Sequence, residues 1–262
     1  MALPVSPAAL RKLVKDVESS GRDARPLVVG GARELATVLR RELARGGAPG
    51  AVRESDDPRG GLVLVYVLGR DPDGRDEDAL KRARRARVPI VAVAVGPVSE
   101  SRSIAYVLAT DVVRVGAGEG FPVDAIARAV ASRLGEEAAP LAARLPFLRR
   151  AVADRIVASF AHKNGIVGAA VFVPGADLPV LVLNQARMLL RLSQVYGEES
   201  GRDRLPELAA TLAVGFGLRS AARELLALVP VAGWAVKGAV AYAGTRGLGE
   251  AARRRLESGV TS

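Results

Sequence analysis

Four short apolar runs in the first half of the chain constrain its fold more than any other feature. The runs cover 26–31, 61–69, 88–96 and 111–116, and residues 51–54 are a further candidate strand. Runs that are apolar at consecutive positions are typical of strands buried on both faces, and strands that alternate with helices form parallel sheets. We therefore predict an α/β domain over 22–137, built on a small, mostly parallel sheet.

Helices are expected on either side of these strands. Apolar periodicity predicts helices over 32–43 and 121–134, a basic helix over 79–87 after an acidic turn at 71–78, and another helix between the last two runs. Ser6 and Pro7 predict the start of an N-terminal helix that Gly21 ends, so residues 1–21 form a separate element. Residues 138–163 also have a helical pattern, and we interpret 138–149 as a linker helix.

The order of strands and helices resembles that of Ras-like GTP-binding domains, whose phosphate loop follows the pattern GxxxxGKS/T. The matching turn has Gly30, but Ala36 stands in place of the lysine, and Thr37 alone matches the last position. Residues 96–99 replace the guanine-reading NKxD motif, and no DxxG follows a clear third strand. Because each motif has a direct electrostatic role in phosphoryl transfer, we expect no GTP hydrolysis. The domain is either a degenerate relative of this fold or an unrelated flavodoxin-like or Rossmann-like sheet.

The Gly30-Gly31 turn is a weak candidate site for an anion, because free N–H groups at a helix N-terminus attract negative charge. A tight turn from strand to helix requires glycine in any case, so the pair alone is little support for a ligand. The sequence predicts no cofactor and no metal site.

The C-terminal half carries long stretches with almost no charge. Residues 165–183 contain Asp177 as their single charged side chain, and 225–244 and 208–218 are further apolar runs. The first run is long enough to span a bilayer, but prolines at 174 and 179 interrupt it. A pair of short helices or a re-entrant hairpin therefore suits 165–183 better than a straight span, and we predict a hydrophobic helical bundle over 150–258.

Several segments of this half carry a resemblance to a known family. They are PGADLPVLVLNQARMLLRLSQVYGEE, RLPELAATLAVGFGLRSAARELL and VPVAGWAVKGAVAYAGTRGLGEAARRRLE. Together they resemble domain of unknown function 697, a helical unit often fused C-terminal to Era-like GTP-binding domains and similar to the YcjF membrane protein family. The resemblance covers about residues 150–257. It implies association with membranes and a regulatory role, and it implies no catalytic residues.

Polar side chains among these apolar residues are candidates for structure or interaction. We interpret Asp177 as the N-cap of a helix over 178–196, the alternative being a functional carboxylate inside a membrane. Asn184 and Gln185 are expected to form hydrogen bonds between helices. Arg187 and Arg191 lie four residues apart, which predicts one shared face, either solvated or in contact with lipid headgroups.

Three further residues are candidates for contact with a membrane interface or for a structural role. Lys237 is expected to reach towards a membrane interface, and Trp234 is either an interfacial anchor or a core residue. We interpret His162 as a group at the C-terminal end of a helix.

Composition narrows the class of protein further. The chain has no cysteine and one histidine, which excludes disulfides and thiolate metal sites and makes a histidine-rich zinc site implausible. Its net charge of +10 points to anionic partners, and with aromatic residues at 4% we favour lipid headgroups over nucleic acid. The first 20 residues lack the apolar core of a signal peptide, so a cytoplasmic location is expected.

Together these features predict a non-enzymatic scaffold or regulatory protein on the cytoplasmic side of a membrane. Its partners would be lipid headgroups or a membrane protein, and the α/β domain would bind a protein or sense a ligand. One alternative is a nucleotide- or anion-binding enzyme whose site lies at the strand ends around Gly30, Gly31, Gly69 and Gly96. Another is a soluble helical homo-oligomer that buries its apolar runs.

Overall fold

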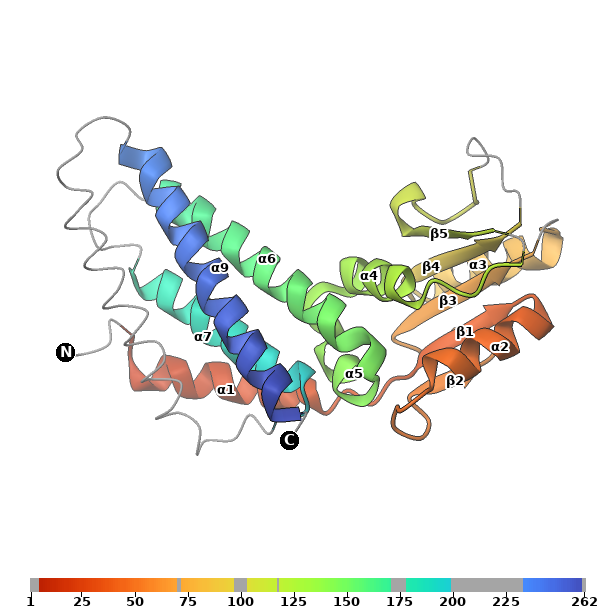
Figure 1. The fold of residues 1–262 in the computed structure, drawn as a ribbon, viewed down its shortest axis with the longest axis horizontal. Coiled ribbons are helices and arrows are strands. Elements are labelled where there is room, and N and C mark those ends of the chain that lie inside the picture. The colour runs from red at the N-terminus through yellow and green to blue at the C-terminus, as the bar shows by residue number, and fades with distance from the viewer. Residues whose placement is uncertain are drawn as a thin grey trace. The chain divides into compact units, whose positions relative to one another are not determined.

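The computed structural model describes residues 5–69, 72–96, 103–116, 118–170, 178–198 and 233–260. The chain divides into two compact units, Asp23–Val152 and a second one that combines Met1–Arg22 with Ala153–Ser262. The first is an α/β unit and the second is helical, which confirms the predicted fold class (Figure 1). The N-terminal helix, expected as a separate element, is therefore part of the helical unit.

A five-stranded parallel sheet is the core of the α/β unit. Its strands are β1 (Leu27–Gly31), β2 (Val52–Glu54), β3 (Val63–Leu68), β4 (Ile90–Val95) and β5 (Val112–Val115). They lie in the order β2-β1-β3-β4-β5, and every neighbouring pair is parallel. All of β3 is buried, which explains its unbroken apolar sequence. This order, 2-1-3-4-5, is the one found in flavodoxin-like sheets.

The connection from β2 to β3 contains no helix. Residues 55–62 form a loop that lies directly against β1. A β-carbon added to Gly30 would be 2.8 Å from the carbonyl oxygen of Ser55, and one added to Gly61 would clash with Val28. Glycine is therefore required at both positions for the loop to lie so close to the strand.

Three helices pack against the sheet: α2 (Arg33–Leu43), α3 (Gly74–Arg85) and α4 (Val123–Leu134). Helix α3 begins before the predicted residue 79, because the acidic stretch forms its first turn. Asp73 and Asp76 make a capping box there, in which each carboxylate accepts a hydrogen bond from the other residue's backbone N–H. The expectation of a turn at 71–78 was therefore wrong for residues 74–78, whereas residue 71 lies outside the described residues.

The helix expected between β4 and β5 is absent from the described residues of that connection. Residues 103–111 contain only the 3-10 helix η1 (Ala109–Asp111), and 97–102 lie outside the described residues. Tyr106 has φ +66, a left-handed conformation that does not continue a right-handed helix. Ile104 and Val107 instead pack against the core cluster between α3 and the sheet.

Residues 138–149, expected as a linker helix, are packed into the α/β unit. They continue from the 3-10 helix η2 (Gly135–Ala138) through α5 (Ala139–Arg144) into the start of α6 (Pro146–Ala170). The side chains of Leu141, Leu145 and Leu148 are buried. Arg144 Nη1 donates a hydrogen bond of 2.7 Å to the carbonyl oxygen of Ala24, which ties this segment to the start of the unit.

The described part of the helical unit consists of α1 (Pro7–Gly21), the later part of α6, α7 (Leu178–Val195) and α9 (Gly233–Val260). The Ser6 hydroxyl oxygen accepts a hydrogen bond of 3.3 Å from the backbone N–H of Ala9, which confirms the predicted N-cap of α1. The apolar face of α1 packs on α7, where Val14 and Val17 contact Leu190. A second cluster joins α1, α7 and α9.

Helix α6 extends further than predicted. It continues to Ala170, so His162 is an exposed residue inside the helix and not a group at its C-terminal end. The apolar run 165–183 is shared between α6 and α7, and residues 171–177 lie outside the described residues, as do the runs 208–218 and the first part of 225–244. Among the helices that the structure describes, none combines the length and the apolar character needed to cross a bilayer.

Small residues allow α6, α7 and α9 to approach closely. A β-carbon added to Gly168 of α6 would lie 2.8 Å from the β-carbon of Ala241 and 3.0 Å from the carbonyl oxygen of Lys237, both in α9. At Gly249 of α9, an added β-carbon would lie 2.7 Å from Val157 of α6. Helix α6 therefore stays helical through its glycines because close contact with α9 offsets their low helix propensity.

Replacing Gly168 with Ala should lower the free energy of unfolding of the helical unit by about 1–2 kcal/mol, because the new methyl group overpacks the contact with α9. Gly247 is the matched control, since a β-carbon there meets no atom within 4 Å and Gly247→Ala should raise stability by about 0.5–1 kcal/mol. Urea unfolding followed by far-ultraviolet circular dichroism measures both. Stabilisation by both substitutions would contradict the close packing.

Candidate functional site

The carboxyl ends of the strands are the first place to look for a ligand. In doubly wound sheets ligands bind where the strand order reverses, which in this sheet is the crevice between the ends of β1 and β3. Gly30 and Gly31, the candidate anion site, end β1 at this point. Gly31 has φ +108, and a β-carbon there would clash with the backbone of Val67. The backbone conformation and packing therefore explain why this residue is glycine, without any ligand.

The chain's own carboxylates occupy the backbone N–H groups at this edge. Asp56 Oδ1 accepts a hydrogen bond of 3.1 Å from the N–H of Gly31, and Glu119 Oε2 accepts one of 3.1 Å from Gly116 after β5. The next N–H, that of Ala32, donates to the carbonyl oxygen of Val67 at 2.9 Å. A phosphate that bound the N–H of Gly31 or Gly116 would therefore have to displace a carboxylate of the same charge.

Tyr66 and Thr37 are also bound to neighbouring side chains. The hydroxyl of Tyr66 in β3 donates to Asp76 Oδ1 at 2.9 Å, and burial together with this hydrogen bond raises the pKa of Tyr66. Thr37, the one match to the last position of a phosphate loop, lies 2.8 Å from Glu54 Oε1 and links α2 to β2. Among the described residues, no group of three or more acidic, histidine or cysteine side chains has the geometry to hold a metal ion.

The predicted hydrogen bonds of Asn184 and Gln185 belong to a polar cluster in the centre of the helical unit. Asn164 and Thr245 are completely buried, and Asn164 Nδ2 donates to Thr245 Oγ1 at 2.9 Å. Asn184 donates to Asn164 Oδ1 at 2.8 Å, and Gln185 donates to Thr245 Oγ1 at 3.2 Å. The cluster joins α6, α7 and α9 and specifies how they are aligned, because any shift would leave buried polar atoms without partners.

Arg187 and Arg191 do not share one environment. Arg187 is exposed, whereas Arg191 is buried and its Nη1 contacts the hydroxyl of Ser20 in α1 at 2.5 Å and Gln194 Oε1 at 2.8 Å. The expectation of a solvated or lipid-facing residue was wrong for Arg191, because α1 covers this side of α7. Nothing in the sequence of α7 alone indicates that a helix from the other end of the chain packs there.

The other predicted residues lie near the start of α7 and α9. The side chain of Lys237 is exposed. Trp234 is in the first turn of α9, but its side chain, like the whole of Asp177, lies outside the described residues. The N-cap expected at Asp177 and the anchor or core role expected for Trp234 stay predictions.

Exposed apolar and basic side chains meet at one end of the helical unit. Ile166 lies half a turn beyond Asn164 in α6, and Val180 lies one turn before Asn184 in α7, so the hydrogen bond between the asparagines places both at the same end. Their side chains are 56% and 47% exposed. Two exposed lysines lie near this end too: Lys163 is three residues before Ile166 in α6, and the backbone of Lys237 in α9 contacts Gly168. We name these four residues, Ile166, Val180, Lys163 and Lys237, the helical tip.

The sequence contained only part of the signal for these sites. Asn164 and Thr245 were not singled out as partners, although a polar residue in an otherwise apolar stretch of helix usually indicates a buried hydrogen bond.

Searches with protein-family models, curated proteins and solved structures found no match for this chain. The resemblance to domain of unknown function 697 and to GTP-binding domains therefore stays a prediction.

Replacing Asn164 with Ala should lower the free energy of unfolding by about 2–3 kcal/mol, because Thr245 and Asn184 each lose a buried hydrogen-bond partner. The matched control is His162→Ala in the same helix, whose exposed side chain should matter by less than about 0.5 kcal/mol. Urea unfolding measures both, and equal losses would contradict a structural role for the polar cluster.

GTP with Mg²⁺ should leave the amide resonance of Gly31 unchanged in the full chain, because Asp56 already accepts its hydrogen bond. Nuclear magnetic resonance spectra of Asp56→Ala should show a large shift of this amide, and spectra of Asp57→Ala in the same loop should not. A saturable shift of the Gly31 amide on addition of GTP would instead support the nucleotide-binding alternative.

Proposed function

We propose that this protein is a non-enzymatic regulatory or scaffold protein that binds peripherally to an anionic membrane surface through its helical unit. The observation that carries the proposal is the helical tip, where two exposed aliphatic side chains and two exposed lysines lie towards the same end of the helical unit. This combination is typical of elements that insert apolar side chains at the boundary of a bilayer while basic groups contact the headgroups.

Charge supports the same conclusion. The described residues of the helical unit include 13 basic and 6 acidic side chains, a net charge of +7. Each basic residue near an anionic surface contributes about 1 kcal/mol to binding, and the attraction decreases with added salt. Two partly inserted aliphatic side chains add a contribution that salt does not screen.

The carboxyl edge of the sheet weighs against the enzymatic alternative. Asp56 and Glu119 accept hydrogen bonds from two backbone N–H groups at this edge, those of Gly31 and Gly116, and a phosphate would compete with them for these donors. Under this proposal the α/β unit binds a protein or a small ligand. Its resemblance to GTP-binding domains is limited to the order of its strands and helices. A location on the cytoplasmic side of the membrane is part of the proposal.

Full-length protein should sediment with vesicles of phosphatidylcholine mixed with phosphatidylglycerol, and should stay in solution with phosphatidylcholine alone. The double variant Ile166→Ser, Val180→Ser should bind the anionic vesicles about tenfold more weakly, since it removes the inserting groups. Val38→Ser is the matched control, because Val38 is 51% exposed but belongs to α2 in the other unit.

Two results would overturn this proposal. One is an absence of binding to anionic vesicles at low salt. The other is equal binding by the double variant and Val38→Ser, which would leave charge alone as the cause. If the protein does not bind vesicles and instead self-associates in a way that the double variant abolishes, the tip is an interface between copies of the chain.

A further inference from the structure

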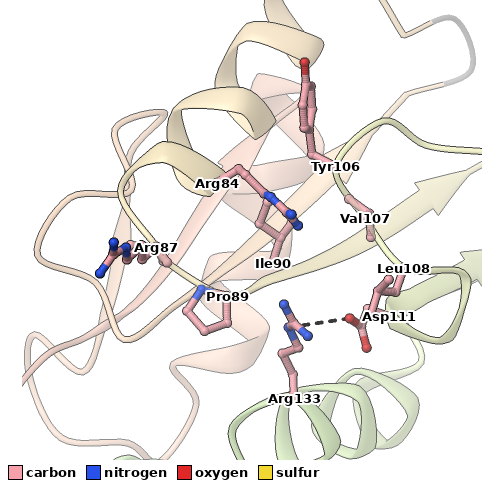
Figure 2. Close-up of a pocket in the computed structure, with 10 residues that line it drawn as sticks. Arg84, Arg87, Pro89, Ile90, Tyr106, Val107, Leu108, Asp111 and Arg133 are labelled. Carbon is pink, nitrogen blue, oxygen red and sulfur yellow. Dashed lines mark ion pairs between the residues drawn. The ribbon is translucent and has the colours of Figure 1, made fainter.

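A pocket opens at the opposite edge of the sheet, where β4 and β5 begin. It has a volume of about 410 Å³ and is bounded by the end of α3, the start of β4, the segment 106–108, Asp111 and α4 (Figure 2). This volume lies within the range of pockets that bind small molecules, roughly 300–1,000 Å³. Because all strands are parallel, the amino ends of β4 and β5 lie at the edge of the sheet opposite to the glycine turns, so the pocket is separate from the carboxyl-edge site.

Three arginines line the pocket, and one carboxylate accompanies them. Arg84 lies in the last turn of α3, Arg133 lies in the last turn of α4, and Arg87 follows α3. Figure 2 shows Arg84 and Arg133 extending from their helices towards the region of Pro89 and Ile90, with Arg87 directed to one side. Arginine is common in the last turn of a helix because it complements the helix dipole, so its presence alone defines no site.

The positive charge of this pocket is only partly neutralised. Asp111 is 5% exposed, and its Oδ2 lies 3.6 Å from Nε of Arg133, longer than the usual 2.7–2.9 Å of a charge-assisted hydrogen bond. Arg84 and Arg87 form no ion pair with any residue that the structure describes. Three guanidinium groups and one carboxylate leave the pocket with a charge of +2.

Two backbone conformations single out the same place. Arg87 has φ +56 and Tyr106 has φ +66, and within the described ranges they are the two residues other than glycine with positive φ. Arg87 follows the end of α3, where a left-handed residue is common, whereas residues 103–105, the described residues before Tyr106, are not helical. A left-handed conformation in a large side chain costs about 1–2 kcal/mol, and such residues cluster at ligand sites.

The pocket also has an exposed apolar wall. Leu108 is 57% exposed and Tyr106 is 39% exposed, and both line it. Water contacts these side chains in the absence of a ligand, so a ligand with an apolar portion would bury them and gain free energy. The guanidinium groups, in turn, present planar pairs of N–H donors that match the oxygen atoms of a carboxylate or a phosphate.

We propose that this pocket binds a small organic anion. A carboxylate or phosphate group would contact Arg84 and Arg133, and an aromatic or aliphatic portion would lie against Tyr106 and Leu108. The site is independent of the helical tip, so the proposal stands whether or not the protein binds membranes. It gives the α/β unit a ligand to sense.

Phenyl phosphate and benzoate are suitable probes, with inorganic phosphate and benzyl alcohol supplying the charged and the aromatic half alone. Each is added to the full-length protein while the methyl resonances of Val107 and Leu108 are followed by nuclear magnetic resonance. Phenyl phosphate, benzoate or both should produce saturable shifts, and the two half-probes should bind at least about tenfold more weakly. A preference between the two aromatic anions identifies the oxyanion.

Arg84→Gln should weaken binding of the preferred probe by about tenfold or more, because it removes a charge-assisted hydrogen bond. Arg85→Gln is the matched control, since Arg85 is also exposed at the end of α3 but does not line the pocket. Resonances outside the pocket should be unchanged in both variants, which shows that the unit stays folded.

Three outcomes would overturn the proposal. The first is an absence of saturable shifts with both aromatic anions. The second is an equal loss of affinity in Arg84→Gln and Arg85→Gln, which would indicate a general charge effect. The third is binding of either half-probe as tight as that of the aromatic anions, which would show that the charged and apolar walls do not act together.

Discussion

A fully parallel sheet has two apolar faces, and covering both is the constraint on which the α/β unit depends. Helices α2, α3 and α4 pack against the strands, and the loop 55–62 lies on β1 in place of a crossover helix. This loop has two consequences. It requires glycine at position 30 of β1 and at position 61 within the loop, and it brings Asp56 to the N–H of Gly31. The packing of one connection therefore decides the chemistry of the edge where such sheets usually bind ligands.

Much of the fold was predictable from the sequence because local patterns determine it. Strands β3 and β4 are continuous apolar runs, and α1 has a hydroxyl cap followed by proline. Apart from the start of α3, where a local capping box was missed, two of the errors arose where contacts between distant segments decide. Arg191 is buried because α1 covers it, and α6 continues through Gly168 because α9 lies against that glycine. The residues next to Arg191 and Gly168 in the sequence predict neither the burial of Arg191 nor the continuation of α6.

The candidate sites were likewise predictable only where a local sequence pattern indicates them. The sequence indicated Gln185 and Asn184 as hydrogen-bonding residues, but their partners Thr245 and Asn164 lie in other helices. In the sequence, the arginines that line the pocket at the start of β4 and β5 are ordinary charged residues at helix ends, because a sequence pattern does not show that the ends of α3 and α4 border the same pocket. Tyr106 gives no sequence signal at all, since a left-handed tyrosine is a product of its tertiary surroundings.

Because α1 packs on α7, the helical unit is formed by two stretches of the chain that are far apart in the sequence. In topological terms, the α/β unit is an insertion between the first helix of the helical unit and the remaining helices. During synthesis the apolar face of α1 therefore stays exposed to water until α7 has been synthesised. The long sequence separation between the two helices also slows folding. A fragment that ends at residue 152 would retain α1 without α7, so the helical unit is best isolated as a fusion that joins α1 to the C-terminal helices.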